Sequence, residues 1–307
     1  MPPIRPLIGL LLSLVLAAVL LGGCGQGGPG GSASGRLNVV AAEDSWGSLA
    51  AQLGGNRVEV TSIITNPAAD PHDYEPNSED AREMAAAEVA IVNGIGYDQW
   101  AQKLIDANPS PERMLLDVGD LLGLEAGDNP HQWYSPTAVY KVINRITTDY
   151  MAADPEHRGY YLRQQSRFEN RRSFREYETL LATIRSRYAG TAVGASESVF
   201  EPLATALGLK LVTPPGFFDA VAEGTEPSPS EKAETDAQIA DRNIAVWVYN
   251  SQNATPDVQR LNDDAAAAGV PIATVTETLT PEGASFQDWM SHQLRGLQRA
   301  LARSAQG

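Results

Sequence analysis

The chain has 307 residues, and its 38 acidic side chains outnumber its 23 lysines and arginines, which gives a formal net charge of −15 at pH 7. An acidic chain without a basic patch repels nucleic acid, so we expect no nucleic-acid partner. The acidity is compatible with cation binding, although on its own it is commonly a solubility feature. The length is sufficient for two domains, and the single cysteine excludes an intrachain disulfide.

The first 24 residues have the order of a secretory signal, with a basic start at Arg5, an apolar run over 7–21 and small residues before Cys24. The apolar run is too short for a membrane span of about 20 residues. Leu21-Gly22-Gly23-Cys24 resembles the lipobox of bacterial lipoproteins, which implies that Cys24 is lipid-modified and becomes the first mature residue. The alternative is cleavage nearby, with Cys24 uninvolved. Residues 25–35 are rich in glycine and are expected to form a flexible tether.

Apolar runs alternate with helical patterns from residue 36 to residue 153, which predicts an N-terminal α/β domain with a parallel sheet. The strands are expected at 37–42, 58–65, 89–94 and 114–118. The helices are expected at 46–53, 77–87, 97–107 and 135–151, the last with Pro136 in its first turn.

Residues 154–188 interrupt this alternation with apolar positions at spacings near three, four and seven, among them Tyr161, Phe168 and Tyr177. The pattern predicts one long amphipathic helix that connects two domains, and two shorter helices with a kink near 170–173 are the alternative. Alternation resumes over 189–307, with strands expected at 191–195, 210–213, 244–249 and 271–276 and helices at 200–207, 230–242, 255–268 and 285–302. We therefore predict an α/β fold with two parallel-sheet lobes joined by a single long, rigid helix.

Two of the four histidines occur in similar contexts, Asp70-Pro71-His72-Asp73-Tyr74-Glu75-Pro76 and Asn129-Pro130-His131-Gln132-Trp133. Proline restricts the backbone, so each imidazole is expected on a rigid turn, which suits a metal ligand. His157 and His292 have no comparable context and are expected to be solvated. Ligands of parallel sheets gather beyond the carboxyl ends of strands, where Glu197 and Glu277 each follow an apolar run.

Each of these residues also has a simpler explanation. His72 could cap a turn, Glu197 could be a favourable acid at a helix start, and Glu277 could be a surface acid in a loop. Tyr74 and Trp133 are expected to pack rather than to take part in chemistry. Other acids compete for the role of metal ligand; they are Asp73, Glu75, Glu201 and Glu226.

These residues make the chain resemble the zinc- and manganese-binding family of solute-binding lipoproteins that serve ABC importers. The two Pro-His sequences resemble that family's first and second ligand motifs. Ser196-Glu197-Ser198-Val199-Phe200 and Val275-Thr276-Glu277-Thr278-Leu279 lie where its third and fourth ligands occur. The resemblance covers nearly all of the mature chain and implies a metal site formed by His72, His131, Glu197 and Glu277 in the cleft between the lobes.

The chain departs from that family pattern in three places. Glu197 stands where zinc members usually have histidine, and Glu277 stands where aspartate is usual. The His-rich loop that many zinc members carry before the second motif is absent, because residues 124–129 form a short segment without histidine.

The expected ligand set bears on the choice of metal. Two neutral imidazoles and two carboxylates would carry two negative charges, which balance one divalent cation. Oxygen donors favour harder ions such as Mn²⁺, whereas histidine and carboxylate are ordinary zinc ligands and zinc has the higher intrinsic affinity. We therefore expect one Mn²⁺ or Zn²⁺ ion, bound as cargo, and the choice between them stays open.

The resemblance implies a monomeric, extracytoplasmic binding protein that is anchored to the outer face of the bacterial cell membrane through Cys24. Such a protein captures the ion and delivers it to an ABC permease without catalysis. One alternative is a metal-dependent hydrolase that uses the same site. It would need an open coordination position and a general base, and the sequence contains no His-Glu-x-x-His motif. The other alternative is a surface adhesin with an incidental metal.

Overall fold

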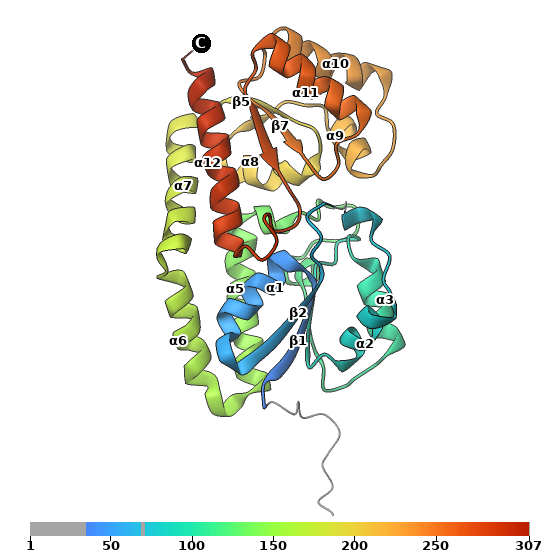
Figure 1. Cartoon of the computed structure of the whole chain (residues 1–307), viewed down its shortest axis with the longest axis vertical. Coiled ribbons are helices and arrows are strands. Elements are labelled where there is room, and N and C mark those ends of the chain that lie inside the picture. Colours follow the sequence, from blue (N-terminus) through green and yellow to red (C-terminus); the bar gives the residue numbers. More distant parts are fainter. Residues whose placement is uncertain (1–34, 69–70, 307) are drawn as a thin grey trace, which may run out of the picture. The chain divides into compact units, whose positions relative to one another are not determined.

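The first lobe is built on a parallel sheet of four strands, β1 (Leu37–Glu43), β2 (Val58–Ile64), β3 (Val89–Val92) and β4 (Met114–Asp117), in the order β2-β1-β3-β4 (Figure 1). Residues 39–43 and 89–92 of the two central strands are buried, as expected for strands covered on both faces. The computed structural model describes residues 35–68 and 71–306. The predicted signal peptide, Cys24 and all of the predicted tether except Gly35 therefore lie outside the described residues.

The helices of the first lobe begin where the sequence supplies caps. Asn77 accepts hydrogen bonds from the amides of Glu79 and Asp80, and the Asp80 carboxylate accepts one from the amide of Asn77, which fixes the start of α2. Helix α5 starts with Pro136 at its first position, as predicted. The short helix α4 was not predicted. The helices are α1 (Asp44–Gly54), α2 (Ser78–Ala86), α3 (Gln99–Ala107), α4 (Val118–Leu122) and α5 (Pro136–Ala153).

The second lobe repeats the topology of the first. Its parallel strands β5 (Ala192–Ala195), β6 (Lys210–Leu211), β7 (Trp247–Asn250) and β8 (Ile272–Val275) have the order β6-β5-β7-β8. Helix α9 was not predicted, because Pro214-Pro215-Gly216 has the composition of a turn. The helices of this half are α8 (Glu201–Leu207), α9 (Pro215–Ala222), α10 (Pro229–Ala240), α11 (Pro256–Ala268) and α12 (Phe286–Ser304).

The connection between the lobes consists of two helices in succession. A 3₁₀ turn at Pro155–His157 leads into α6 (Arg158–Glu169), and α7 (Arg172–Tyr188) follows after residues 170 and 171. The helix is interrupted where the Asn170 side chain donates to Ser166 O at 2.8 Å and the backbone of Arg171 is extended. The two-lobe α/β fold is thus confirmed, and the connection follows the alternative of two helices rather than one.

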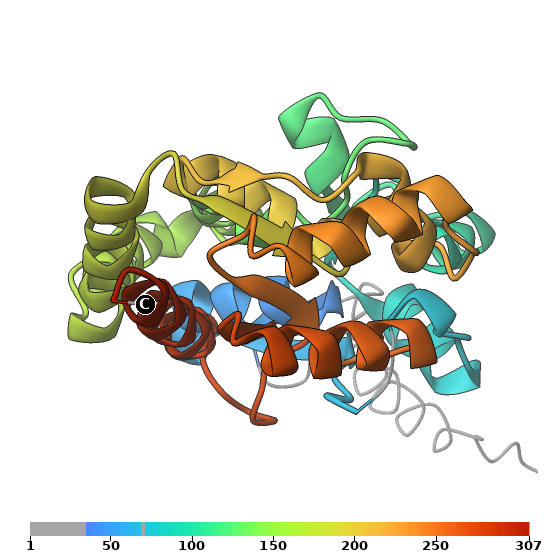
Figure 2. The ribbon, with the colours of Figure 1, turned by 90° about the horizontal axis from the view of Figure 1, so that it is seen from above.

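The C-terminal helix α12 lies beside α7, which is part of the connection between the lobes (Figure 1, Figure 2). The rings of Tyr177 and Phe286 have centroids 6.0 Å apart. At the start of α12, the Phe286 amide donates to Ser48 Oγ at 3.0 Å, and Gln287 Nε2 donates to Gln52 Oε1 at 2.8 Å. Since Ser48 and Gln52 belong to α1, α12 contacts the first lobe as well as the second.

The described residues from 36 onward form one compact unit. Its main core is continuous between the lobes, with Trp133 of the first and Val275 of the second in the same cluster of buried side chains. The domain boundaries expected after residues 153 and 188 stay predictions. No helix in the described part of the chain combines the length and the apolar character needed to cross a membrane.

Candidate metal centre

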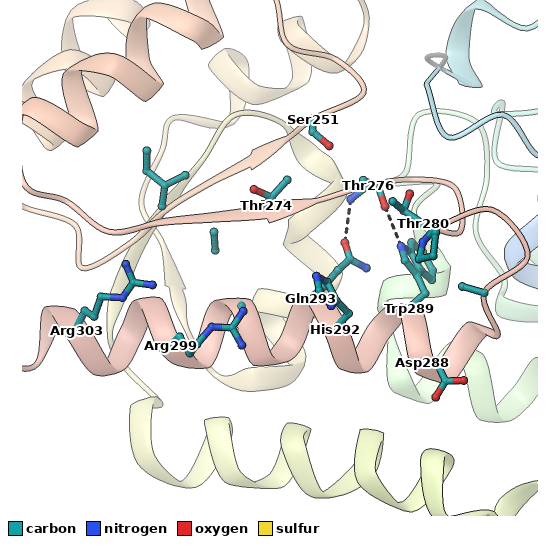
Figure 3. A pocket seen from close by; sticks show the side chains of 15 residues that line it. Ser251, Thr274, Thr276, Thr280, Asp288, Trp289, His292, Gln293, Arg299 and Arg303 are labelled. Atoms are coloured by element: carbon teal, nitrogen blue, oxygen red, sulfur yellow. Dashed lines mark hydrogen bonds between the residues drawn. The ribbon is translucent and has the colours of Figure 1, made fainter.

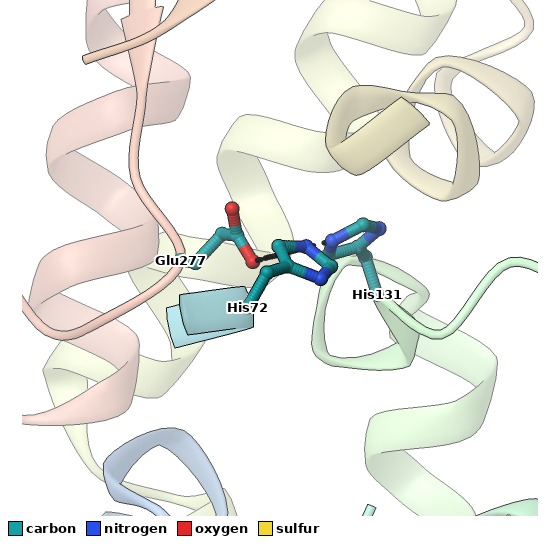
Figure 4. Close-up of side chains that lie close together, drawn as sticks. All are labelled: His72, His131 and Glu277. Carbon is teal, nitrogen blue, oxygen red and sulfur yellow. Dashed lines mark ion pairs between the residues drawn. The ribbon is translucent and has the colours of Figure 1, made fainter. Parts of the chain in front are cut away.

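Side chains from three loops of the two lobes meet at one point. His72 lies on a 3₁₀ turn formed by Pro71–Asp73, and His131 directly precedes a second 3₁₀ turn at Gln132–Tyr134. Glu277 is the second residue after β8. The three side chains point toward one another in Figure 4. Their position after strands β2, β4 and β8 agrees with the rule that ligands bind beyond the carboxyl ends of parallel strands.

The spacing of these three side chains fits a metal ion. Glu277 Oε2 lies 3.4 Å from His72 Nε2 and 3.3 Å from His131 Nε2, and one ligand atom of each residue lies within 4.8 Å of the other two. A zinc ion with bonds of about 2.0–2.2 Å and tetrahedral angles would separate its ligand atoms by about 3.3–3.6 Å. The two contacts of Glu277 already have this spacing, so little rearrangement is needed to hold a divalent ion.

The hydrogen bonds around His131 select the tautomer that a metal ligand needs. Asn129 Nδ2 donates to Ser198 O at 2.8 Å and to Glu201 Oε2 at 2.9 Å, so Asn129 Oδ1 is the atom that accepts from His131. His131 Nδ1 lies 3.0 Å from Asn129 Oδ1 and therefore carries the proton. This leaves the lone pair of Nε2 directed at the cluster.

His131 Nε2 is buried and has no hydrogen-bond partner among residues 35–68 and 71–306. Its nearest polar neighbour in the cluster is Glu277 Oε2, and a neutral imidazole nitrogen and a carboxylate oxygen are both acceptors. Buried polar atoms without a partner are rare and costly. A cation placed between the two atoms would satisfy both of them.

Both oxygens of Glu277 have partners. Oε2 accepts a hydrogen bond from the Tyr97 hydroxyl at 2.8 Å, and Oε1 accepts one from Asn250 Nδ2 at 2.7 Å. Burial raises the pKa of Glu277, but the attraction and hydrogen bonds of the His131 and His72 rings, when these carry a positive charge, outweigh burial and hold the pKa below the usual range of glutamate. The carboxylate is therefore ionised, and no lysine or arginine of the described residues pairs with it.

His72 is the most accessible member of the cluster. Its side chain is 26 % exposed, against 1 % for His131 and 0 % for Glu277. Its ring packs edge to face against Tyr97, with centroids 4.9 Å apart, and lies 5.5 Å from the ring of His131. Trp133 is fully buried against His131, at 5.5 Å between ring centroids, so its expected packing role is confirmed.

Glu197 is buried but lies outside the three-residue cluster. Its Oε1 accepts a hydrogen bond from Asn250 Nδ2, the nitrogen that also donates to Glu277, and its Oε2 accepts one from Asn253 Nδ2 at 2.9 Å. Asn250 thus separates Glu197 from the cluster by one hydrogen-bonded amide. Metal ligation by Glu197 stays a prediction.

The competing acids lie elsewhere in the described structure. Asp73 and Glu75 are exposed, Glu201 accepts from Asn129, and Glu226 pairs with Lys232. None of them belongs to the cluster that the described residues form.

The other two histidines also lie outside the cluster. His292 is exposed on α12, as expected. His157 Nδ1 lies 2.8 Å from Asp154 Oδ1, and Asp154 also accepts hydrogen bonds from Arg57 and Tyr161. His157 therefore stabilises the start of the connection and is not fully solvated.

A family model described as "Zinc-uptake complex component A periplasmic" matches residues 39–300. The chain belongs to this family. Both sheets, apart from the first two residues of β1, and all four predicted ligands lie inside the matched range.

Curated relatives are named for two different metals. The manganese-binding lipoprotein MntA of Halalkalibacterium halodurans is 30 % identical over 149 residues, which are 47 % of this chain and 49 % of that protein. The zinc-binding lipoprotein AdcA of Streptococcus pneumoniae is 24 % identical over 323 residues, with 95 % of this chain and 60 % of that protein covered. The chain thus spans about half to three-fifths of the length of these relatives.

Solved structures share the fold. FpvC of Pseudomonas aeruginosa in complex with Mn²⁺ aligns with a TM-score of 0.70 at 22 % identity, over 88 % of this chain and 99 % of that one. The periplasmic zinc-binding protein TroA of Treponema pallidum aligns with a TM-score of 0.72 at 16 % identity, over the same shares. At these identities the likeness establishes the two-lobe fold alone.

The sequence did not identify two side chains that shape the centre, Tyr97 and Asn250. Tyr97 contacts Glu277 through its hydroxyl and His72 through its ring. Asn250 ends strand β7, and its position at a carboxyl strand end is the signal that could have found it. Tyr97 lies shortly after Asn93-Gly94 in the sequence, but nothing in its spacing distinguishes it from a packing residue.

A second group of buried acids lies around the carboxyl end of β1. Both oxygens of Asp44 accept from the amide of Leu279, at 3.0 and 3.3 Å, and burial raises the pKa of Asp44 to about 7. Burial, with the charge of Asp98 nearby, also raises the pKa of Glu43. Asp98 accepts from the amides of Asn93 and Gly94, and burial raises its pKa as well. The Asp44 contact links the first lobe to the loop that carries Glu277.

Proposed function

We propose that this chain is a binding protein that captures one divalent transition-metal ion, Mn²⁺ or Zn²⁺, and delivers it to an ABC permease without catalysis. The observation that carries the proposal is the convergence of two imidazoles on one buried carboxylate, with His131 Nε2 lacking a hydrogen-bond partner among the described residues. An ion in this position would satisfy the nitrogen and balance the carboxylate charge. The names of the relatives, which specify manganese in one case and zinc in the other, support cargo of this class.

The proposed ligands are His72, His131 and Glu277, with Glu197 as the fourth. Asn250 bridges the carboxylates of Glu197 and Glu277 in this structure. Glu197 would become a ligand when a bound ion replaces Asn250 as the partner of these two carboxylates. Each carboxylate can bind through one or two oxygens, so coordination numbers above four are accessible, and these suit Mn²⁺. The same donors are ordinary zinc ligands, which keeps both metals in the proposal.

The proposed mechanism of release involves local movement of the ligands rather than large rotation of the lobes. Three helices, α6, α7 and α12, link the proposed domains 36–153 and 189–307, and α12 is hydrogen-bonded to the first lobe. Crystal structures of the metal-free and metal-bound protein would test this. A large domain rotation between them would count against it.

We further propose that the protein is monomeric and works outside the cytoplasm, held at the outer face of the cell membrane by a lipid on Cys24. Relatives named lipoproteins support the anchor. The glycine-rich segment 25–35 would then serve as the tether. Mass spectrometry of the mature N-terminus tests this directly, and a mature chain that begins elsewhere or carries no lipid on Cys24 would contradict it.

The function is tested by elemental analysis of protein purified without added metal, followed by competition between Mn²⁺ and Zn²⁺. We expect one ion per chain and a loss of affinity of more than about 100-fold in His131→Ala, since a metal ligand is removed. Glu226→Gln, which changes an exposed acid far from the cluster in sequence, should bind as the unchanged protein does. Full affinity in His131→Ala would remove this residue from the site, and exclusive zinc binding would exclude manganese as cargo.

A further inference from the structure

A cavity lies in the half of the chain that follows the connecting helices. It has a volume of about 530 Å³ and lies between the edge strand β8 and helix α12 (Figure 3). None of the four proposed metal ligands lines it. Volumes of about 300–1,000 Å³ are usual for pockets that bind small molecules.

The two ends of this cavity differ in charge. Arg299 and Arg303 lie at one end, one helical turn apart on α12, and Asp288 lies at the other end in Figure 3. Asp288 is already engaged at the start of the helix, where Ser285 Oγ donates to its carboxylate at 2.6 Å. The cationic end therefore has no acidic counterpart among the lining residues that remains available.

Neither guanidinium has an ion pair or hydrogen bond within the described part of the chain. Arg295 on the same helix behaves differently, since it pairs with Glu176 at 3.4 Å. Like charges four residues apart on a helix repel each other. A cation in the last turn of a helix is favourable, which accounts for Arg303, whereas Arg299 is exposed to solvent at the same end of the cavity.

The remainder of the cavity wall is largely apolar. Ile272 of β8, Pro281 and Ala284 of the following loop, and the buried Trp289 of α12 line it. A cavity with a partly apolar wall and two unpaired guanidinium groups at one end matches a molecule with an apolar part and an anionic end, because arginine binds carboxylate and phosphate through two parallel hydrogen bonds.

We propose that this cavity binds a small organic anion. Its carboxylate or phosphate group pairs with Arg299 and Arg303, and its apolar part contacts Ile272 of β8. The proposal does not rest on the proposed metal function, since none of the four proposed metal ligands lines the cavity.

Titration calorimetry of the full mature chain with phenyl phosphate and with benzoate tests the proposal and distinguishes phosphate from carboxylate ligands. At least one probe should bind saturably, with a dissociation constant of about 1 mM or lower. Arg299→Gln and Arg303→Gln should each weaken binding by about tenfold or more. Arg295→Gln on the same helix should leave affinity within about twofold. Inorganic phosphate should bind about tenfold more weakly than phenyl phosphate, since it lacks the apolar part.

A second variant tests the cavity without changing its charge. Thr274 is exposed in the middle of β8 and lines the cavity, so Thr274→Trp should fill it and weaken probe binding by about tenfold or more. The absence of saturable binding by both organic probes would overturn the proposal. Equal weakening in Arg295→Gln would overturn it too, because binding would then follow overall charge. Inorganic phosphate binding as tightly as phenyl phosphate would overturn the assignment to an organic anion.

Discussion

Glu197 and Glu277 accept hydrogen bonds from the same nitrogen, Nδ2 of Asn250, although they follow different strands of the second sheet. Both carboxylates are buried. The two N–H groups of one amide thus hold two acids together that would otherwise repel each other. The arrangement makes Asn250 a positioning residue for the proposed centre, and it explains how the fold tolerates the acids before a cation balances them.

Replacing Asn250 should therefore affect the metal-free protein most. In Asn250→Ala both carboxylates lose a donor, and an unsatisfied buried group costs about 1–3 kcal/mol, more when it is charged. We expect the midpoint of thermal unfolding to fall in the metal-free state and to recover more strongly on metal addition than in the unchanged protein. Asn253→Ala removes a donor from Glu197 and from Val221 O but from neither oxygen of Glu277, and it should have a smaller effect. Equal effects of the two substitutions would contradict the bridging role.

Asn129 should influence metal affinity without touching the metal, because its Oδ1 accepts from His131 Nδ1 and so directs Nε2 at the cluster. Loss of such a supporting contact weakens metal binding by about 10–100-fold. We expect a decrease of this size in Asn129→Ala, measured by competition with a metal-binding dye. Asn144→Ala, at an exposed position of α5, is the matched control. Unchanged affinity in Asn129→Ala would show that the His131 ring is oriented by other contacts.

Tyr134 should couple stability to metal binding. Its buried hydroxyl lies 2.7 Å from Thr276 O and 2.6 Å from Gln293 Oε1, and Thr276 directly precedes Glu277. Tyr134→Phe should lower the free energy of unfolding by about 1–3 kcal/mol and also weaken metal binding, since the loop before Glu277 loses an anchor.

Tyr150→Phe provides the control for this prediction. The Tyr150 hydroxyl is buried as well, and it donates to Ala50 O at 3.1 Å within the first lobe. This substitution should lower stability and leave metal affinity unchanged. Equal loss of metal affinity in both variants would mean that the effect is a general consequence of destabilisation.

The titration of Asp44 should lower the free energy of unfolding as the pH rises. Burial raises its pKa from 3.8 to about 7, so between these values the folded chain binds more protons than the unfolded chain. The free energy of unfolding then decreases with increasing pH across this window and is constant for this group outside it. The shift of about three units corresponds to at most about 4 kcal/mol.

Asp44→Asn removes this titration and keeps an oxygen that can accept from the Leu279 amide. In urea unfolding of the metal-free protein, the variant should match the unchanged chain near pH 4 and exceed it in stability near pH 8. Asp241→Asn, at an exposed position, should show no such divergence. A variant that is less stable at pH 8 would mean that the ionised Asp44 stabilises the fold.

The parts of this structure that the sequence predicts are those marked by a pattern within a few neighbouring residues. The strands of both sheets show as apolar runs, and the Pro-His sequences indicated two of the three clustered residues, because proline constrains the backbone of its own neighbours. Glu277 was predicted from its place after an apolar run and from a family resemblance. The amphipathic pattern continues through residues 170 and 171, so the sequence allows both one long helix and two helices at this point.

The features that were not predicted depend on contacts between distant segments. Asn250 could be placed at a strand end, but its role depends on Glu197 and Glu277 approaching it from two other loops. The pairing of α12 with both lobes depends on hydrogen bonds to α1, more than 230 residues earlier in the chain. Helix α9 begins with residues typical of turns, and its burial against the second core stabilises it.

The difference in exposure among the three clustered side chains implies an order for ligand exchange. Water can reach the His72 ring, whereas His131 and Glu277 are closed to it. A bound ion would therefore exchange its bond to His72 for a water molecule first, while the two buried donors still held it. The rate of metal dissociation would then depend on the motion of one short turn, Pro71–Asp73. The affinity would depend mainly on His131 and Glu277.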